Sequence, residues 1–198
     1  GDARIVAAAE ERAAVRGDGE RFDLRPMQRE LLGPSALVAR DQRAVFARGH
    51  CILEGVPGVP ALDARVTGML SGLGALRSQI KVVSKLRTDC DQTKGAAAAQ
   101  TMLTANQNLT AIYGACGPPI LGAIQSIKNA GISPGSIIVV GFDALPDEVA
   151  QIKAGTETGS VAQFPAKIGS LGIATLYRAV RGKAVPKNVD TGTAFVTK

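Results

Sequence analysis

The chain has 198 residues, 45% of them apolar and 20% charged, so it can bury a core as one large domain or as two small lobes. No apolar run approaches the roughly 20 residues that span a bilayer, and the charged N-terminal stretch shows no signal-peptide pattern, which leaves export open. The formal net charge is +6, yet the basic residues are scattered, without a long run or interleaved aromatic residues, which argues against nucleic-acid binding.

Residues 1–49 differ in composition from the rest of the chain. They contain nine Arg and no Lys, whereas the remainder contains nine Lys and five Arg. Helices are predicted around Ile5–Arg16 and Met27–Leu32, with a weak strand at Arg4–Ala8. A G+C-rich gene read in a shifted frame, a foreign fusion and a divergent native segment would each produce such a stretch, and the sequence does not choose among them.

From His50 onward, predicted strands and helices alternate. Strands are predicted at Cys51–Gly55, Ile80–Leu86, Leu109–Ala115, Ser136–Phe142, Gly159–Phe164 and Ala194–Thr197. Helices are predicted at Pro60–Leu76, Gln92–Asn106, Pro118–Gly131, Leu145–Gly155 and Ala166–Gly182. This alternation is typical of an α/β fold, in which a parallel sheet with right-handed crossovers carries helices on both faces.

Proline and glycine residues support several of these boundaries. Pro60 is placed to begin its helix, and Gly131, Gly155 and Gly182 are placed to end theirs as C-terminal caps. The run Ser136–Phe142 is continuously apolar and rich in β-branched residues, and we expect this strand to be buried on both faces.

Polar side chains follow two successive strands in the segment Ile137–Pro165. Asp143 comes directly after the first of these strands, and Gln163 stands near the end of the second. The carboxyl ends of parallel strands meet at one edge of the sheet, beside the crevice where α/β proteins bind ligands. The segment therefore predicts a site for a small polar molecule.

Several segments of the chain resemble periplasmic sugar-binding proteins, in particular the ribose-binding-like group that serves ATP-driven sugar importers. The resemblance covers the C-terminal two-thirds of such a protein, spans Ile52–Lys198 and does not extend over residues 1–49. It rests on GVPGVPALDARVTG, TDCDQTKG, YGACGPPILGAIQSIKNAG, VVGFDALPDEVAQIKAG, SVAQFPAKIGSLG and VRGKAVPKNVDTGTAFVTK.

The resemblance implies a type I periplasmic binding fold, with two α/β lobes around a cleft. Residues 50–163 would form the C-terminal lobe, and residues 164–192 would return to the N-terminal lobe. Residues 193–198 would cross back as a final strand. Residues 1–49 would be a truncated or divergent remnant of the N-terminal lobe.

The resemblance also implies three ligand-binding side chains, Arg65, Asp143 and Gln163. A carboxylate accepts two hydroxyl hydrogens and a guanidinium donates a planar fork, so this set suits a sugar. Each residue has a plainer interpretation. Asp143 could cap a helix or form a turn, Arg65 could pair with Asp63 or Glu54 on the surface, and Gln163 could simply end a strand.

Cys90 and Cys116 are also candidate ligand-binding residues, because they occupy cleft positions in the same resemblance. Cys90 stands where many members place an aromatic residue, and Cys116 stands where ribose binders place Asn. A thiol replaces neither role, which argues against ribose as the ligand. A disulfide between the two is conceivable. The neighbouring Asp89 and Asp91 could contact ligand, although capping of the following helix is the simpler interpretation.

Other chemistry is poorly supported. The three cysteines show no metal-binding spacing and His50 is the one histidine, so no metal and no cofactor is predicted. No GxSxG or phosphate-binding glycine motif occurs, which argues against an enzyme. Phe142 and Phe164 are expected to pack in the core or hinge rather than to stack on a ligand.

The predicted function is capture of a monosaccharide or related polyol by hinged closure of two lobes, followed by delivery to a membrane permease. The resemblance further implies an extracytoplasmic, soluble or lipid-anchored monomer. One alternative is the effector-binding domain of a lac-repressor-like regulator, although residues 1–49 contain no convincing helix-turn-helix. Another is a fragment that binds nothing, since most of one lobe is missing.

Overall fold

The computed structural model describes residues 49–198. Its strands are β1 (Gly49–Glu54), β2 (Lys81–Arg87), β3 (Leu109–Gly114), β4 (Ile138–Phe142), β5 (Gly159–Gln163) and β6 (Thr193–Val196). Its helices are α4 (Pro60–Gly72), the 3-10 helix η1 (Gly74–Ser78), α5 (Gln92–Ala105), α6 (Gly117–Asn129), α7 (Pro146–Ala154) and α8 (Pro165–Val180). The helices and the strand predicted before residue 49 lie outside the described residues.

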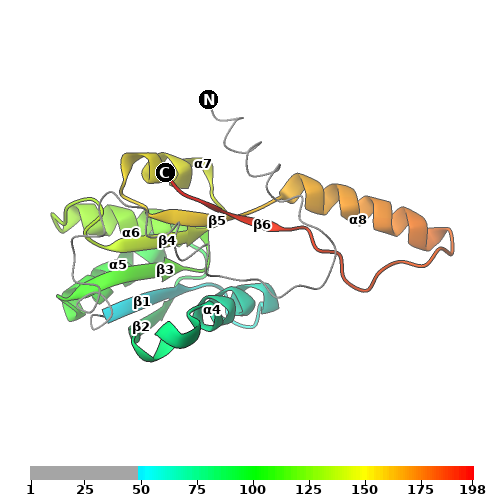
Figure 1. Cartoon of the computed structure of the whole chain (residues 1–198). Coiled ribbons are helices and arrows are strands. Elements are labelled where there is room, and N and C mark those ends of the chain that lie inside the picture. The colour runs from blue at the N-terminus through cyan, green and yellow to red at the C-terminus, as the bar shows by residue number, and fades with distance from the viewer. Residues whose placement is uncertain (1–48) are drawn as a thin grey trace.

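These strands form one sheet in the order β2-β1-β3-β4-β5-β6 (Figure 1). The first five run parallel, and the predicted α/β class is confirmed. The sheet is not purely parallel, because β6 pairs antiparallel with β5, with Thr193 opposite Gln163. We call this sheet and the helices α4 to α7 the α/β body.

One face of the sheet is packed tightly by α5 and α6. Along β1, Cys51 and Leu53 point to this face and join a core with Met102 of α5 and Ile120 of α6. The alternate residue Ile52 points to the opposite face, where it meets Val66 of α4. Alternation along one strand thus places helices on both faces, as predicted.

The α4 face is covered less completely than the α5–α6 face. A hollow of about 690 Å³ lies between α4 and the sheet, and its lining is mostly apolar, including Tyr113, Val140 and Phe195. In β4, buried and half-buried residues therefore alternate. The prediction that Ser136–Phe142 is buried on both faces is wrong, because the described helix on this face contacts β1 and leaves β4 partly open.

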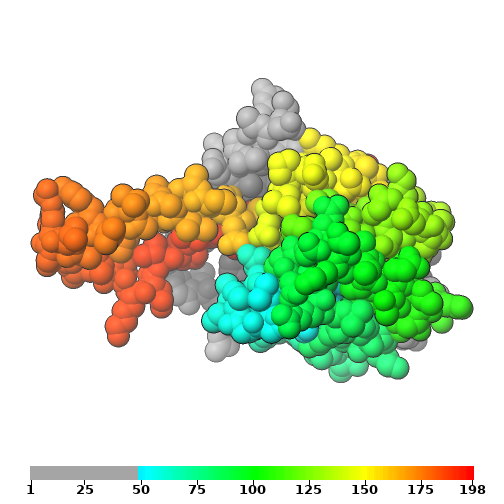
Figure 2. Space-filling model, turned by 180° about the vertical axis from the view of Figure 1, so that it is seen from behind, coloured from blue at the N-terminus to red at the C-terminus, as the bar shows by residue number. Residues whose placement is uncertain are grey.

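Helix α8 projects away from the α/β body, as Figures 1 and 2 show from opposite sides. None of its residues is buried. Ile173, Leu176, Tyr177 and Val180 recur at helical spacing and are more than half exposed. An apolar stripe of this kind on a helix with no buried residue is a surface that would be buried against another structure.

Local end signals were predicted correctly. Pro60 is the first residue of α4, and Gly155 ends α7 in the left-handed region with φ 78°. Gly131 and Gly182 follow α6 and α8, each with φ 70°.

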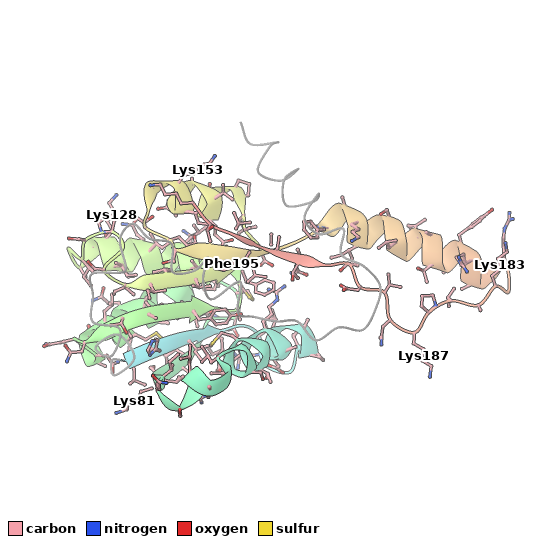
Figure 3. All side chains as sticks on the ribbon, viewed as in Figure 1. Lys81, Lys128, Lys153, Lys183, Lys187 and Phe195 are labelled. Carbon is pink, nitrogen blue, oxygen red and sulfur yellow. A yellow bond between two sulfur atoms is a disulfide. The ribbon has the colours of Figure 1, made fainter. Side chains whose placement is uncertain are left out.

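No helix within residues 49–198 is long and apolar enough to cross a membrane. The lysines labelled in Figure 3 lie at separate places around the molecule and do not gather on one face.

Candidate functional site: a polar cluster at the strand ends

Asp143 occupies a tight turn at the carboxyl end of β4. Its N–H donates to the carbonyl of Val161 on the neighbouring β5 at 2.8 Å. Asp143 and Ala144 both have positive φ, 92° and 48°, a region that residues other than glycine seldom adopt. Such strain is concentrated at functional sites. Asp143 is not the cap of α7, since that helix begins after Leu145.

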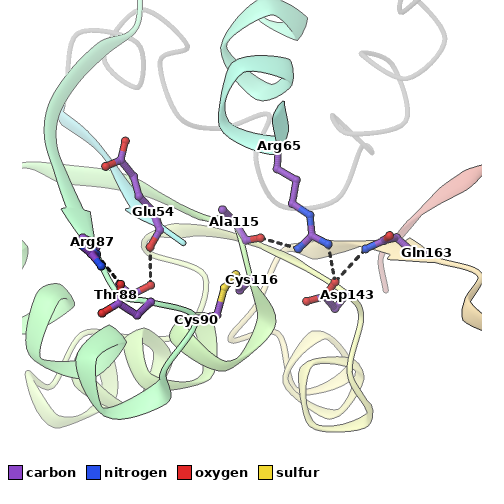
Figure 4. Close-up of a disulfide and its surroundings, with 10 residues drawn as sticks. Glu54, Arg65, Arg87, Thr88, Cys90, Ala115, Cys116, Asp143 and Gln163 are labelled. Carbon is purple, nitrogen blue, oxygen red and sulfur yellow. Dashed lines mark hydrogen bonds and ion pairs between the residues drawn. A yellow bond between two sulfur atoms is a disulfide. The ribbon is translucent and has the colours of Figure 1, made fainter. Parts of the chain in front are cut away.

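Arg65, Asp143 and Gln163 come together at this edge of the sheet, although they lie on α4, the β4–α7 turn and β5 (Figure 4). The Arg65 Nη2 atom lies 3.3 Å from Asp143 Oδ1, with side-chain exposures of 16% and 30%. Gln163 Nε2 donates to the same oxygen at 3.2 Å. The plainer interpretation of Arg65 as a partner of Asp63 or Glu54 does not match this geometry.

Arg65 has further contacts that hold its side chain in place. Its Nη1 atom donates to the carbonyl of Ala115 at 2.8 Å, and its guanidinium lies 3.8 Å from the centre of the Phe142 ring. Tyr113 donates from its hydroxyl to the Arg65 carbonyl at 3.2 Å, and burial raises the pKa of Tyr113 to about 12. Phe142 lies against the arginine and also lines the hollow beside α4, and its expected role in packing stays a prediction.

Cys90 and Cys116 are joined by a disulfide, with Cα atoms 5.5 Å apart. Cys90 lies in the turn after β2, and Cys116 is the residue before α6. Neither therefore carries an S–H group that could donate to a ligand. The disulfide that the sequence analysis considered between these two cysteines is thus present in the structure. Cys51 is the remaining thiol, and burial raises its pKa to about 11.

The two acidic residues beside Cys90 serve the loop itself. Asp91 caps α5, with its Oδ1 atom accepting from the Lys94 N–H at 2.8 Å. Asp89 forms ion pairs with Lys94 and Arg87, and these partners hold its pKa below the usual value. The capping interpretation thus applies to Asp91, while ion pairs with Arg87 and Lys94 hold the Asp89 side chain in place.

A buried acidic pair lies beneath the Asp143 turn, and sequence reasoning missed it. Glu148 accepts from the Leu145 N–H at 2.8 Å and from the Ser160 hydroxyl at 3.0 Å. Glu157 is only 2% exposed, and burial together with the neighbouring Glu148 raises its pKa to about 9. Burial also raises the pKa of Glu148. Within the described residues, neither carboxyl oxygen of Glu157 has a hydrogen-bond partner, and its burial favours the neutral, protonated form.

Ser160 connects this pair to the turn above it, because its hydroxyl oxygen accepts from the Ala144 N–H at 3.0 Å. The one sequence signal for this pair was Glu148 in the first turn of a helix, where its carboxylate can reach back to the helix start. Within residues 49–198, no group of three or more His, Cys, Asp or Glu side chains is placed to hold a metal ion.

Convergent polar side chains at the strand ends of a doubly wound sheet lie where α/β proteins of this kind bind ligands. The family model of a periplasmic binding protein domain matches residues 42–184. The chain therefore belongs to the periplasmic binding protein family.

Individual relatives agree with this assignment. The chain is 32% identical over 182 residues to the D-allose-binding periplasmic protein of Escherichia coli, an alignment that covers 84% of this chain and 58% of that protein. It is 32% identical over 138 residues to the ribose import binding protein of Bacillus subtilis, covering 70% of this chain and 43% of that protein. The chain thus spans about half the length of the curated relatives it matches.

Solved structures show the same fold. A solute-binding protein from Agrobacterium vitis bound to α-D-tagatopyranose superposes with a TM-score of 0.72 at 29% identity, over 78% of this chain and 51% of that one. A solute-binding protein from Burkholderia graminis in complex with D-arabinose gives a TM-score of 0.71 at 32% identity, over 77% of this chain and 54% of that one. Both are solute-binding proteins of ABC transporters.

Proposed function

We propose that this chain is the ligand-binding part of a solute-binding protein that captures a monosaccharide or related polyol for an ATP-driven importer. The observation that carries the proposal is the convergence of Arg65, Asp143 and Gln163 at one edge of the sheet. The named ligands of its relatives, D-allose, ribose, tagatose and arabinose, support a single sugar ring as the ligand class.

The polar cluster suits a sugar because it brings hydrogen-bond donors and an acceptor together at one edge of the sheet. Asp143 Oδ1 accepts from both Arg65 and Gln163. Two vicinal hydroxyls could replace these internal contacts, with the carboxylate accepting and the guanidinium and amide donating. Cys90 and Cys116 contribute to the same edge as a disulfide, which can offer apolar contact but no S–H donor.

A complete binding protein needs a second lobe to close over the ligand. In this proposal, residues 50–163 form the present lobe, residues 164–192 extend into the second lobe, and residues 193–198 return to the first. The exposed stripe on α8 is the surface that would pack within that second lobe. Closure about the crossing segments would bury the ligand and present both lobes to a membrane permease.

The remaining parts of the proposal follow from the relatives. They are binding proteins rather than enzymes by name, and the E. coli relative is periplasmic. For this chain we infer binding without chemical change of the ligand, an extracytoplasmic location and a monomeric state. No nucleic acid is needed for this role.

The first prediction concerns ligand binding by the 198-residue chain itself. Titrations with D-allose, D-ribose, D-tagatose and D-arabinose, followed by NMR, should show weak binding because half of the polar contacts of a two-lobed cleft are absent. Each lost hydrogen bond to a charged group lowers affinity about tenfold or more. Calorimetry that finds submicromolar affinity would overturn the inference that a second lobe is required.

The second prediction concerns Asp143. Asp143→Asn should lower sugar affinity by about tenfold or more. The amide has one acceptor oxygen instead of two, and it carries no charge. Asp147→Asn is the matched control, since Asp147 is an exposed acid in the first turn of α7. Equal affinities for the two variants would remove Asp143 from the binding site.

A further inference from the structure

The Cys90–Cys116 disulfide bridges two loops that are not neighbours in the sheet. Cys90 follows β2 and Cys116 follows β3, and β1 lies between these strands. The crosslink therefore passes across the carboxyl end of β1. Gly55 stands at that end, and a Cβ atom there would meet Leu62 Cδ1 at 2.7 Å and Cys90 Sγ at 3.3 Å. Glycine permits this close approach.

The loop that carries Cys90 has a conformation that needs support. Asp89 and Cys90 both have positive φ, 53° and 56°, which is unfavourable for residues with a Cβ atom. Thr88 anchors the loop start through its N–H and hydroxyl, which donate to the Glu54 carbonyl at 2.9 and 2.7 Å. The disulfide anchors the other end of the same turn.

The opposite end of the crosslink adjoins the polar cluster. Ala115 directly precedes Cys116, is fully buried and supplies the carbonyl that accepts from Arg65 Nη1 at 2.8 Å. Its own N–H donates to the Leu53 carbonyl at 3.0 Å. Figure 4 shows the disulfide on one side of Ala115 and the guanidinium of Arg65 on the other. A displacement of Cys116 thus moves an acceptor that positions Arg65.

We propose that the Cys90–Cys116 disulfide is a positioning element of the sugar site, holding the Ala115 carbonyl, and through it Arg65, in the geometry that binds ligand. This inference rests on the proposed function. The disulfide forms when the two thiols together lose two protons and two electrons to an oxidised dithiol carrier, which is reduced in turn. Sugar affinity therefore depends on the oxidised state of this cysteine pair.

The first measurement counts thiols in the full chain. Alkylation in denaturant without reductant should modify one cysteine, Cys51, and alkylation after dithiothreitol should modify three. Dithiothreitol supplies the two electrons and becomes a cyclic disulfide. Cys51→Ser is the matched control, which should show no thiol before reduction and two afterwards. Three reactive thiols without reductant would overturn the proposal.

The second measurement follows Arg65 directly and needs no sugar. The side-chain Nε–H signal of Arg65, assigned with Arg65→Lys, should shift when the disulfide is reduced or replaced in Cys90→Ser/Cys116→Ser. The signal of Arg181, which stacks on Tyr177 at 4.4 Å on α8, should not shift. An unchanged Arg65 signal in a folded, reduced chain would show that the disulfide does not position the arginine.

The third measurement is sugar affinity in the two redox states, with D-allose as the probe. Reduction should weaken binding about tenfold, the effect of losing one charge-assisted hydrogen bond. In an Arg65→Ala background, reduction should have no further effect. Equal affinity in both states would overturn the proposal. If D-allose, D-ribose, D-tagatose and D-arabinose all fail to bind in both states, the proposed function fails, whereas the Arg65 signal still decides whether the disulfide positions that side chain.

Discussion

At the residue scale, the two strand-end members of the polar cluster were predictable from the α/β pattern, whereas Arg65 was predicted from the family resemblance. Asp143 and Gln163 end successive strands, and parallel strands bring their carboxyl ends to one edge. The pairing of Cys90 with Cys116 was only conceivable from sequence, since 26 residues separate them and β1 intervenes. The Glu148–Glu157 pair was missed, because each acid taken alone resembles an ordinary surface charge.

This acidic pair leads to a third prediction, on stability against pH. Burial raises the folded-state pKa of Glu157 from its ordinary value of 4.5 to about 9, so the folded chain holds a proton that the unfolded chain releases. Its contribution to stability is complete below 4.5 and is lost as pH rises toward about 9.

Glu157→Gln should therefore reduce the fall in melting temperature across this pH window, because the amide has no proton to lose. Thermal melts followed by circular dichroism at several pH values measure the slope. Asp147→Asn, which removes an exposed acid from the same region, should keep the original slope. Parallel slopes for Glu157→Gln and the unmodified chain would contradict the buried pair.

At the element scale, helix packing depends on close contacts that sequence patterns do not reveal. Helices α5 and α6 pack against each other through glycine. A Cβ atom on Gly95 would lie 2.4 Å from Pro119 Cα, and one on Gly122 would lie 2.1 Å from the Gln92 carbonyl oxygen. Helix starts and ends were predicted because their signals are local, whereas this interface joins residues from two separate helices.

The fourth prediction tests the α5–α6 contact. Gly122→Ala should destabilise the α/β body by about 2 kcal/mol, because the backbone of α5 cannot move away without opening the core. Gly172→Ala on α8 is the matched control, with nothing within 4 Å of the added atom. It should gain about 0.5–1 kcal/mol from helix propensity. Urea unfolding would measure both, and equal effects would contradict the packing argument.

At the scale of the whole molecule, the chain divides into a packed body and a projecting helix. The α/β body has a core around Leu53, Ile112 and Ile120, while α8 has no buried residue. The hollow beside α4 shows the same contrast, since apolar residues of β3, β4 and β6 line an open face. This explains why a strand predicted to be covered on both faces is only partly buried.

The fifth prediction follows from this division. Leu176→Asp on α8 should leave the stability of the α/β body unchanged, because the side chain is 59% exposed and packs against no core residue. Ile120→Ala, in the core, should cost about 2–5 kcal/mol. Thermal unfolding of both variants distinguishes them. A large loss of stability in Leu176→Asp would mean that α8 packs against the body in solution.

The sequence by itself determined the alternation of strands and helices, their end residues and the strand ends at which polar side chains meet, because these features depend on near neighbours and on the geometry of parallel sheets. Only the tertiary structure decided the antiparallel β6, the crosslink across β1, the buried acidic pair and the open α4 face. The antiparallel pairing and the crosslink join residues that are distant in the chain, while the acidic pair and the open face depend on burial, which no local pattern encodes.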